Sequence, residues 1–239
     1  MKSSKKIERI EVPTKDIVNE CIKEFDENNS EVESSIRKLF DEFDDSSFEK
    51  ILVKVIVLNN RYSTGLNDNQ LEEGKKDELD KKGKKYPVDV ITMAKHILGL
   101  SEEIAKVKNP ENVINLVNKM SDLGEQYKKA YSFATKYCAW TLKKMDNPMN
   151  IPIVDSFVKG FLYYLNEKEE AGLYYKGGFA QKNLNDYDKF CKIYKSFIEK
   201  YDFLSDKTYK EIDKYIWQYS KNLLKKNNGK EPIDIRIYN

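Results

Sequence analysis

The sequence is poor in the residue types that most often build a metal site or a nucleophilic triad. It contains one histidine, His96, and three widely spaced cysteines, Cys21, Cys138 and Cys191, with no CxxC pair. A Ser–His–Asp or Cys–His mechanism would therefore depend on His96 alone, and a lone histidine is more often a satisfied boundary residue. Sparse thiols in odd number indicate reduced cysteines in a cytosol. We expect a cytoplasmic protein with no metal and no cofactor.

Several longer signals are also absent. The sequence has no P-loop, no GxGxxG motif and no internal repeat. No apolar run approaches the roughly 20 residues that span a bilayer, and the N-terminal MKSSKKIERIEVP lacks the apolar centre of a signal peptide, so we expect no membrane association. The 42 Lys and Arg nearly balance the 40 Asp and Glu, for a formal net charge of +2. That balance is not the overall basic character of an obligate nucleic-acid binder, although it does not exclude a local basic patch.

What the sequence does contain is a helical pattern. Hydrophobic residues make up 40% of 239 residues, enough for a core, and they recur at helical spacing along most of the chain. We expect an all-α fold of about nine helices with little or no sheet. It would be one domain over 1–239, with a core at 47–165, N-terminal helices at 1–46 and C-terminal helices at 166–239 packed on that core. We expect a monomer.

Capping residues, prolines and glycines predict where the helices begin and end. The predicted starts are Thr14, Ser30 with Glu33 as a capping box, Ser46 or Ser47, Pro87, Pro110, Pro152, Tyr187 and Thr208. Gly99 would close the helix opened at Pro87, and Gly124 would separate the short helix at Pro110 from a longer one that reaches Lys144. Residues 233–238 alternate as a short extended segment would.

The segment ILVKVIVL at 51–58 is apolar on almost every side. Periodicity alone fits a central buried helix or a buried strand, and no partner strand lies nearby, so we expect a helix. A polar stretch follows from Asn59 to Tyr86. Its charged run at 66–86 is either a solvated insertion or an arm that contacts DNA. Its beginning, NNRYST, brings amides and a guanidinium that could read a base edge or serve ordinary turn chemistry.

The stretch from Tyr131 to Phe161 stands out because it combines a lysine, a proline-led apolar run and a carboxylate. Lys136 precedes Asp155 by 19 positions, and Asp155 would lie in the first turn of a helix that opens at Pro152. Free N–H groups and the macrodipole at a helix N-terminus favour an ionised carboxylate there. Asp155 could equally be a helix cap, and Lys136 could equally be a solvated lysine.

IPIVDSFV at 151–158 resembles the segment that carries the catalytic aspartate in the helix-hairpin-helix DNA glycosylase superfamily, and SFATK places Lys136 where the bifunctional members have a lysine. FEKILVKVIVLNNRYS at 48–63 is similar to the family's buried helix and to the asparagine-rich loop of its 8-oxoguanine branch. The hairpin position, KKAYSFATK, lacks the family's glycines. The resemblance covers 47–165.

The resemblance implies an N-glycosylase that extrudes a modified base, such as an oxidised one, from duplex DNA and removes it. Asp155 would stabilise the cationic sugar. Lys136, as a neutral amine, would attack C1′ and give lyase activity. The DNA-binding residues would be Asn59, Asn60, Arg61, Tyr62 and Ser156. Two alternatives stay open: a non-catalytic nucleic-acid-binding or phage-defence protein on the same fold, and a helical interaction protein in which Asp155 only caps a helix.

Overall fold

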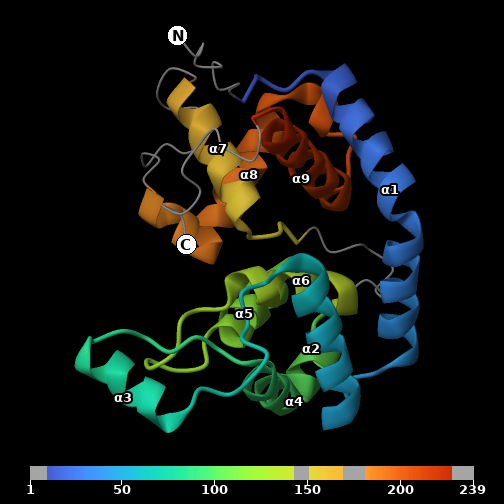
Figure 1. Cartoon of the computed structure of the whole chain (residues 1–239). Helices are drawn as coiled ribbons and strands as arrows, with labels where there is room; N and C mark the ends of the chain where they lie inside the picture. The colour runs from blue at the N-terminus through green and yellow to red at the C-terminus, as the bar shows by residue number, and fades with distance from the viewer. Residues whose placement is uncertain (1–9, 143–150, 169–180, 228–239) are drawn as a thin grey trace. The chain divides into compact units, whose positions relative to one another are not determined.

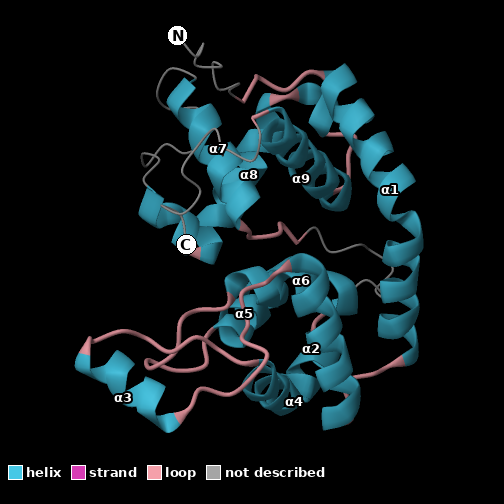
Figure 2. Ribbon diagram, in the orientation of Figure 1, coloured by secondary structure: helices cyan, strands magenta, loops and turns pink. Residues whose placement is uncertain are grey.

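The computed structural model describes residues 10–142, 151–168 and 181–227. Within these ranges the chain forms nine α-helices and two short 3-10 helices, with isolated bridges but no strand, so the expected all-α fold is confirmed (Figure 2). In chain order (Figure 1) the elements are α1 (Lys15–Glu42), α2 (Phe48–Tyr62), α3 (Glu73–Lys81), α4 (Val90–Lys106), α5 (Pro110–Ser121), α6 (Tyr131–Thr141), α7 (Ser156–Lys168), η2 (Gln181–Asn185), α8 (Tyr187–Lys200), η3 (Asp202–Leu204) and α9 (Tyr209–Lys226).

The chain divides into two compact units. One consists of residues 31–153, and the other combines residues 1–30 with 154–239. Helix α1 contributes to both units, since it runs through the boundary at Ser30. The boundary at Ile153 and Val154 falls inside the 47–165 region that the sequence suggested as a core.

Helix α1 is one continuous helix of 28 residues. The expected helix start at Ser30 is therefore wrong, whereas Thr14 does accept a hydrogen bond from the Ile17 N–H at 3.4 Å. No glycine or proline lies between Lys15 and Glu42 to end the helix. The amide groups of Asn28 and Asn29 each donate to the carbonyl four residues earlier at 2.7 Å, so their side chains bond within the helix.

Helix α2 is the centre of the 31–153 unit and packs against α4 and α6. Ser47 caps it, with its hydroxyl accepting from the Lys50 N–H, which confirms both the expected helix and its start. Ile51, Val55 and Leu58 are fully buried at the spacing of one helix face. The other face is less covered, because Val53 and Ile56 are 40% and 39% exposed. The helix is therefore buried on one side rather than all round.

Three expected boundaries near α4 and α6 are wrong. Asp89, not Pro87, caps α4, and α4 continues through Gly99 to Lys106. A single glycine weakens a helix but does not stop it when the flanking turns are buried. The region after Gly124, whose φ is +113°, stays irregular until α6 begins at Tyr131. The expected end of that helix at Lys144 lies outside the described residues.

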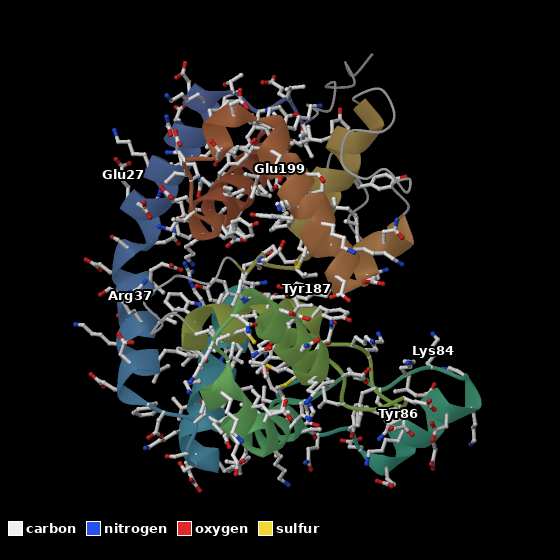
Figure 3. All side chains as sticks on the ribbon, turned by 180° about the vertical axis from the view of Figure 1, so that it is seen from behind. Glu27, Arg37, Lys84, Tyr86, Tyr187 and Glu199 are labelled. Carbon is white, nitrogen blue, oxygen red and sulfur yellow. The ribbon has the colours of Figure 1, made fainter. Side chains whose placement is uncertain are left out.

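The polar stretch at 59–86 is more ordered than expected. Helix α2 extends to Tyr62, and the charged run forms α3, which has no buried residue. Exposed ion pairs such as Lys82–Glu78, at 2.6 Å, run along α3. In the segment that follows it (Figure 3), the Tyr86 hydroxyl donates to the Asp80 carboxylate at 2.6 Å. An ordered, solvent-exposed helix is what a charge-rich insertion with spaced opposite charges can form.

The second unit has an aromatic core built by α7, α8 and α9. Phe161 of α7 makes edge-on ring contacts with Phe197, Tyr215 and Tyr219, at centroid distances of 5.9, 5.6 and 6.0 Å. Such contacts add to the free energy gained by burying the rings. Thr208 and Glu211 form a complete capping box at the start of α9, and the expected helix start at Thr208 is confirmed. The expected segment at 233–238 lies outside the described residues.

Replacing Gly99 by alanine is expected to stabilise the protein. Gly99 is an exposed interior position of α4, and an added Cβ there would meet no atom within 4 Å. The gain in the free energy of unfolding should be about 0.5–1 kcal/mol, because alanine loses less backbone entropy in a helix. Urea unfolding of both proteins measures the difference. The control is Gly124→Ala, which should destabilise because of the positive φ; a loss of stability in Gly99→Ala would contradict the observed course of α4.

Candidate functional site

Lys136 is a buried lysine. It lies in the second turn of α6 and is 6% exposed, so it is not a solvated surface lysine. Its Nζ donates to the Ser132 hydroxyl at 3.1 Å and lies 5.9 Å from the centre of the Tyr62 ring. Burying a long cationic side chain is costly unless the surroundings hold its charge, so a buried lysine of this kind is a candidate functional group.

Asp155 caps α7. One of its carboxylate oxygens accepts a hydrogen bond from the Val158 N–H at 2.9 Å. The expected helix start at Pro152 is wrong: residues 151–155 are irregular, and Asp155 stands one position before the first helical residue, Ser156. Burial lowers the pKa of the Lys159 ammonium one turn further on, and the charge of Asp155 opposes that effect. The hydrogen bond from Val158 shows that Asp155 acts as the N-cap of α7.

The structure fixes Lys136 and Asp155 within different units. Lys136 belongs to the unit formed by 31–153, and Asp155 belongs to the unit that contains α7, α8 and α9. Ser156, the first residue of α7, is half-buried beside Asp155 in the chain.

The asparagines at the end of α2 differ in what they do. Asn59 is buried, and its amide groups hold the turn that follows α2: the NH₂ group donates to the Leu66 carbonyl, while the oxygen accepts from the Thr64 hydroxyl and the Leu66 N–H. Asn59 is thus committed to local structure, one of the two interpretations that the sequence left open. Asn60, by contrast, is exposed.

Arg61 and Tyr62 lie at the last turn of α2. The Arg61 guanidinium is 5.9 Å from the centre of the Tyr62 ring, and the Tyr62 hydroxyl donates to the Glu33 carboxylate at 2.6 Å. Tyr62 therefore connects the predicted polar loop with Lys136, whose ammonium faces the same ring. Of the predicted residues, the structure brings together Lys136 and Tyr62, with Arg61 next to them.

The sequence interpretation missed a buried charged cluster in the same unit. Lys54, 1% exposed, forms an ion pair with Asp45 and donates to the Phe43 carbonyl at 3.2 Å. The Tyr137 hydroxyl donates to the same Asp45 oxygen at 2.6 Å. The Lys54 ammonium also lies 5.0 Å and 5.3 Å from the ring centres of Phe40 and Tyr137, within the range of cation–π attraction.

The electrostatics of this cluster keep Tyr137 neutral. Burial raises the pKa of the Tyr137 phenol, and the charge of Asp45 and its hydrogen bond add to that rise. Tyr137 is therefore a fixed donor to Asp45. The signal that could have revealed the cluster is Lys54 itself, because it shares the buried face of α2 with Ile51 and Val55. A lysine on an apolar face predicts a buried counter-ion.

The remaining candidates, His96 and possible metal ligands, give little support for a catalytic or metal-binding site. The ring nitrogen Nε2 of His96 lies 3.0 Å from the Lys119 carbonyl, as expected of a satisfied boundary histidine. Among the described residues, no group of three or more His, Cys, Asp and Glu side chains could hold a metal ion. None of the helices in the described ranges has the length and apolar character needed to cross a bilayer.

Comparison with known protein families finds a family that matches this chain. The family HI_0787_N, described as an N-terminal domain, matches residues 17–146, more than half of the sequence. The chain belongs to the HI_0787_N family. An uncharacterized protein of Haemophilus influenzae (strain ATCC 51907 / DSM 11121 / KW20 / Rd) is 29% identical over 188 residues, which cover 78% of this chain and 74% of the relative. No solved structure matches. The family match includes Lys54, Lys136 and the end of α2, and it stops before Asp155.

Asp45 is expected to stabilise the 31–153 unit strongly. In Asp45→Asn the Lys54 ammonium stays buried without its counter-ion, so the free energy of unfolding should fall by about 3–5 kcal/mol. Denaturant unfolding measures the loss. Adding Lys54→Met should recover at least half of it, because a well-packed apolar residue can replace a buried ion pair at little cost. Asp44→Asn, at the exposed neighbouring carboxylate, is the control and should change little; equal effects of Asp44→Asn and Asp45→Asn would contradict the assignment.

Proposed function

We propose that this protein is a DNA N-glycosylase-like protein that extrudes and removes a modified base from duplex DNA, with an associated lyase activity. The observation that carries the proposal is the burial of Lys136 beside the ring of Tyr62. A lysine that is held out of water can act as a nucleophile in a way that a solvated lysine cannot. The resemblance of SFATK and IPIVDSFV to the helix-hairpin-helix glycosylases supplies the reaction class.

In the proposed reaction the Lys136 amine forms a bond to C1′ of the extruded nucleotide. The C1′–N bond to the base breaks, and the base leaves with the electron pair. Loss of the amine proton and opening of the sugar then give a Schiff base, from which the strand is cleaved. Asp155 would stabilise the positive charge that develops on the sugar. This role requires the Asp155 carboxylate, at the N-cap of α7, to reach the same sugar as Lys136.

The proposed DNA contacts come from the end of α2 and the start of α7. Asn60 is the asparagine suited to fill the space of the extruded base, because Asn59 is committed to the turn at 64–66. Arg61, Tyr62 and Ser156 would contact the DNA beside it. The protein would act as a monomer without metal or cofactor. Its free cysteines favour the cytoplasm, and burial raises the pKa of the Cys191 thiol to about 12, which makes it unreactive.

A second candidate is a protein that binds nucleic acid without catalysis, for example in defence against phage. The commitment of Asn59 to local structure and the absence of glycine from KKAYSFATK favour it. It predicts DNA binding without strand scission, with an affinity that falls steeply as salt rises. A helical interaction protein is a third candidate, favoured by the cap that Asp155 forms on α7. It predicts no DNA binding at low salt.

Borohydride trapping tests the proposed lysine. With duplex DNA that carries a panel of modified bases, the wild-type protein should form a covalent adduct with at least one base. Lys136→Gln should abolish the adduct. Lys129→Ala, which removes a more exposed lysine that precedes α6, should leave it intact. If wild type forms no adduct with any base, or if Lys136→Gln forms as much as wild type, the lysine mechanism is wrong.

Two substitutions at Asp155 separate catalysis from capping. Asparagine caps a helix about as well as aspartate, so Asp155→Asn should keep the stability and lose the charge, with base excision reduced by about 100-fold or more. Asp155→Ala should also lose about 1 kcal/mol of stability, because it removes the hydrogen bond to the Val158 N–H. Single-turnover excision assays and thermal unfolding measure the two effects. Full excision by Asp155→Asn would show that Asp155 is only a cap.

A further inference from the structure

A cavity of about 580 Å³ that is open to solvent lies on the 31–153 unit, beside the Lys54 cluster. It is formed by the last turns of α1, α4 and α6 and by the loop that joins α1 to α2. Its apolar wall consists of Phe40, Phe43, Ile104, Ala105, Val107 and Leu142. The volume is in the range of about 300–1,000 Å³ that is typical of small-molecule sites.

Asp45 supplies the polar group of this cavity. Its side chain is 8% exposed and lines the cavity. Lys54 and Tyr137 both donate to the same carboxylate oxygen, Oδ1. No residue in the described part of the chain donates to the second oxygen, Oδ2. This oxygen can accept a hydrogen bond from a ligand with an N–H group.

The charges around the cavity favour a cation. Helices α1, α4 and α6 all end here, and each brings the negative end of its dipole, whereas only α2 begins here. Lys54 is the one cation among the residues that line the cavity in the described ranges, and it is already paired with Asp45. The rim carboxylates Asp44 and Glu102 form exposed pairs with Lys50 and Lys106, which solvent screens.

We propose that this cavity binds a small organic cation, an amine whose ammonium group donates to Asp45 Oδ2 and whose apolar body packs against Phe40, Phe43 and Leu142. An anion of the same shape would meet the Asp45 carboxylate and three helix C-termini, so it is excluded. A neutral alcohol can donate one hydrogen bond but gains no charge interaction. The ammonium therefore adds affinity through a charge-assisted hydrogen bond in a partly dehydrated site.

Three probes of similar shape test this specificity. Phenethylamine, phenethyl alcohol and phenylacetate are titrated into the full chain at neutral pH, with calorimetry as the readout. The amine should bind about tenfold more tightly than the alcohol, as expected for a hydrogen bond between charged groups. Phenylacetate should not bind. No binding of the amine, or equal binding of the amine and the alcohol, would overturn the proposal.

A pair of tryptophan substitutions on α4 tests the location. Ala105→Trp places a large side chain at the exposed rim of the cavity and should reduce amine binding at least tenfold without changing the melting temperature by more than a few degrees. Lys95→Trp, at an exposed position of the same helix away from the cavity, should bind the amine as wild type does. Unchanged binding in Ala105→Trp would show that the amine binds elsewhere. This outcome does not depend on any DNA activity, because Lys136 and Asp155 do not line the cavity.

Discussion

The packing of the 31–153 unit depends on how its side chains compensate the buried positive charge of Lys54. Lys54 is 1% exposed at the centre of a helical layer, where an isolated ammonium would cost on the order of 20 kcal/mol in an idealised low-dielectric medium. Asp45, the Phe43 carbonyl and two aromatic rings surround it. These partners come from the α1–α2 loop, from α1 and from α6. The charge therefore fixes the position of the loop relative to α2, and it also ties α6 to both through the hydroxyl of Tyr137.

Helix α6 carries two neighbouring residues with different partners. Tyr137 donates to Asp45, whereas Lys136 donates to Ser132 and faces the ring of Tyr62. Successive residues of an α-helix point about 100° apart, so adjacent positions serve different surroundings. The anchored Tyr137 limits the movement of α6, and the backbone that carries Lys136 is thereby fixed as well. The ion pair at Lys54 thus helps to hold the backbone of Lys136, the residue that we propose as a nucleophile, within its own unit.

Much of the helical architecture could be predicted because its signals are local. Ser47, Pro110 and Thr208 start helices where the sequence suggested, since a cap needs only the few residues around it. The errors at Ser30 and Gly99 show the limits of such local signals. No glycine or proline interrupts α1 near Ser30, and Gly99 lies in a helix whose residues Ile97 and Ile104 are buried. The division at residue 153 depends on contacts between distant segments, which no local pattern reports.

The candidate site was predictable only in part, for a related reason. Lys136 and Asp155 were identified from a motif spacing that is visible along the chain. Their different units, the commitment of Asn59 to the turn at 64–66, and the Lys54 cluster are properties of the folded structure. The buried ion pair of Lys54 could nevertheless have been predicted from the sequence. Because it occupies the same helix face as Ile51, Val55 and Leu58, it required a counter-ion, and Asp45 lies only nine residues earlier. A lysine on the buried face of an apolar helix therefore predicts a buried counter-ion, and here that counter-ion, Asp45, also lines the cavity.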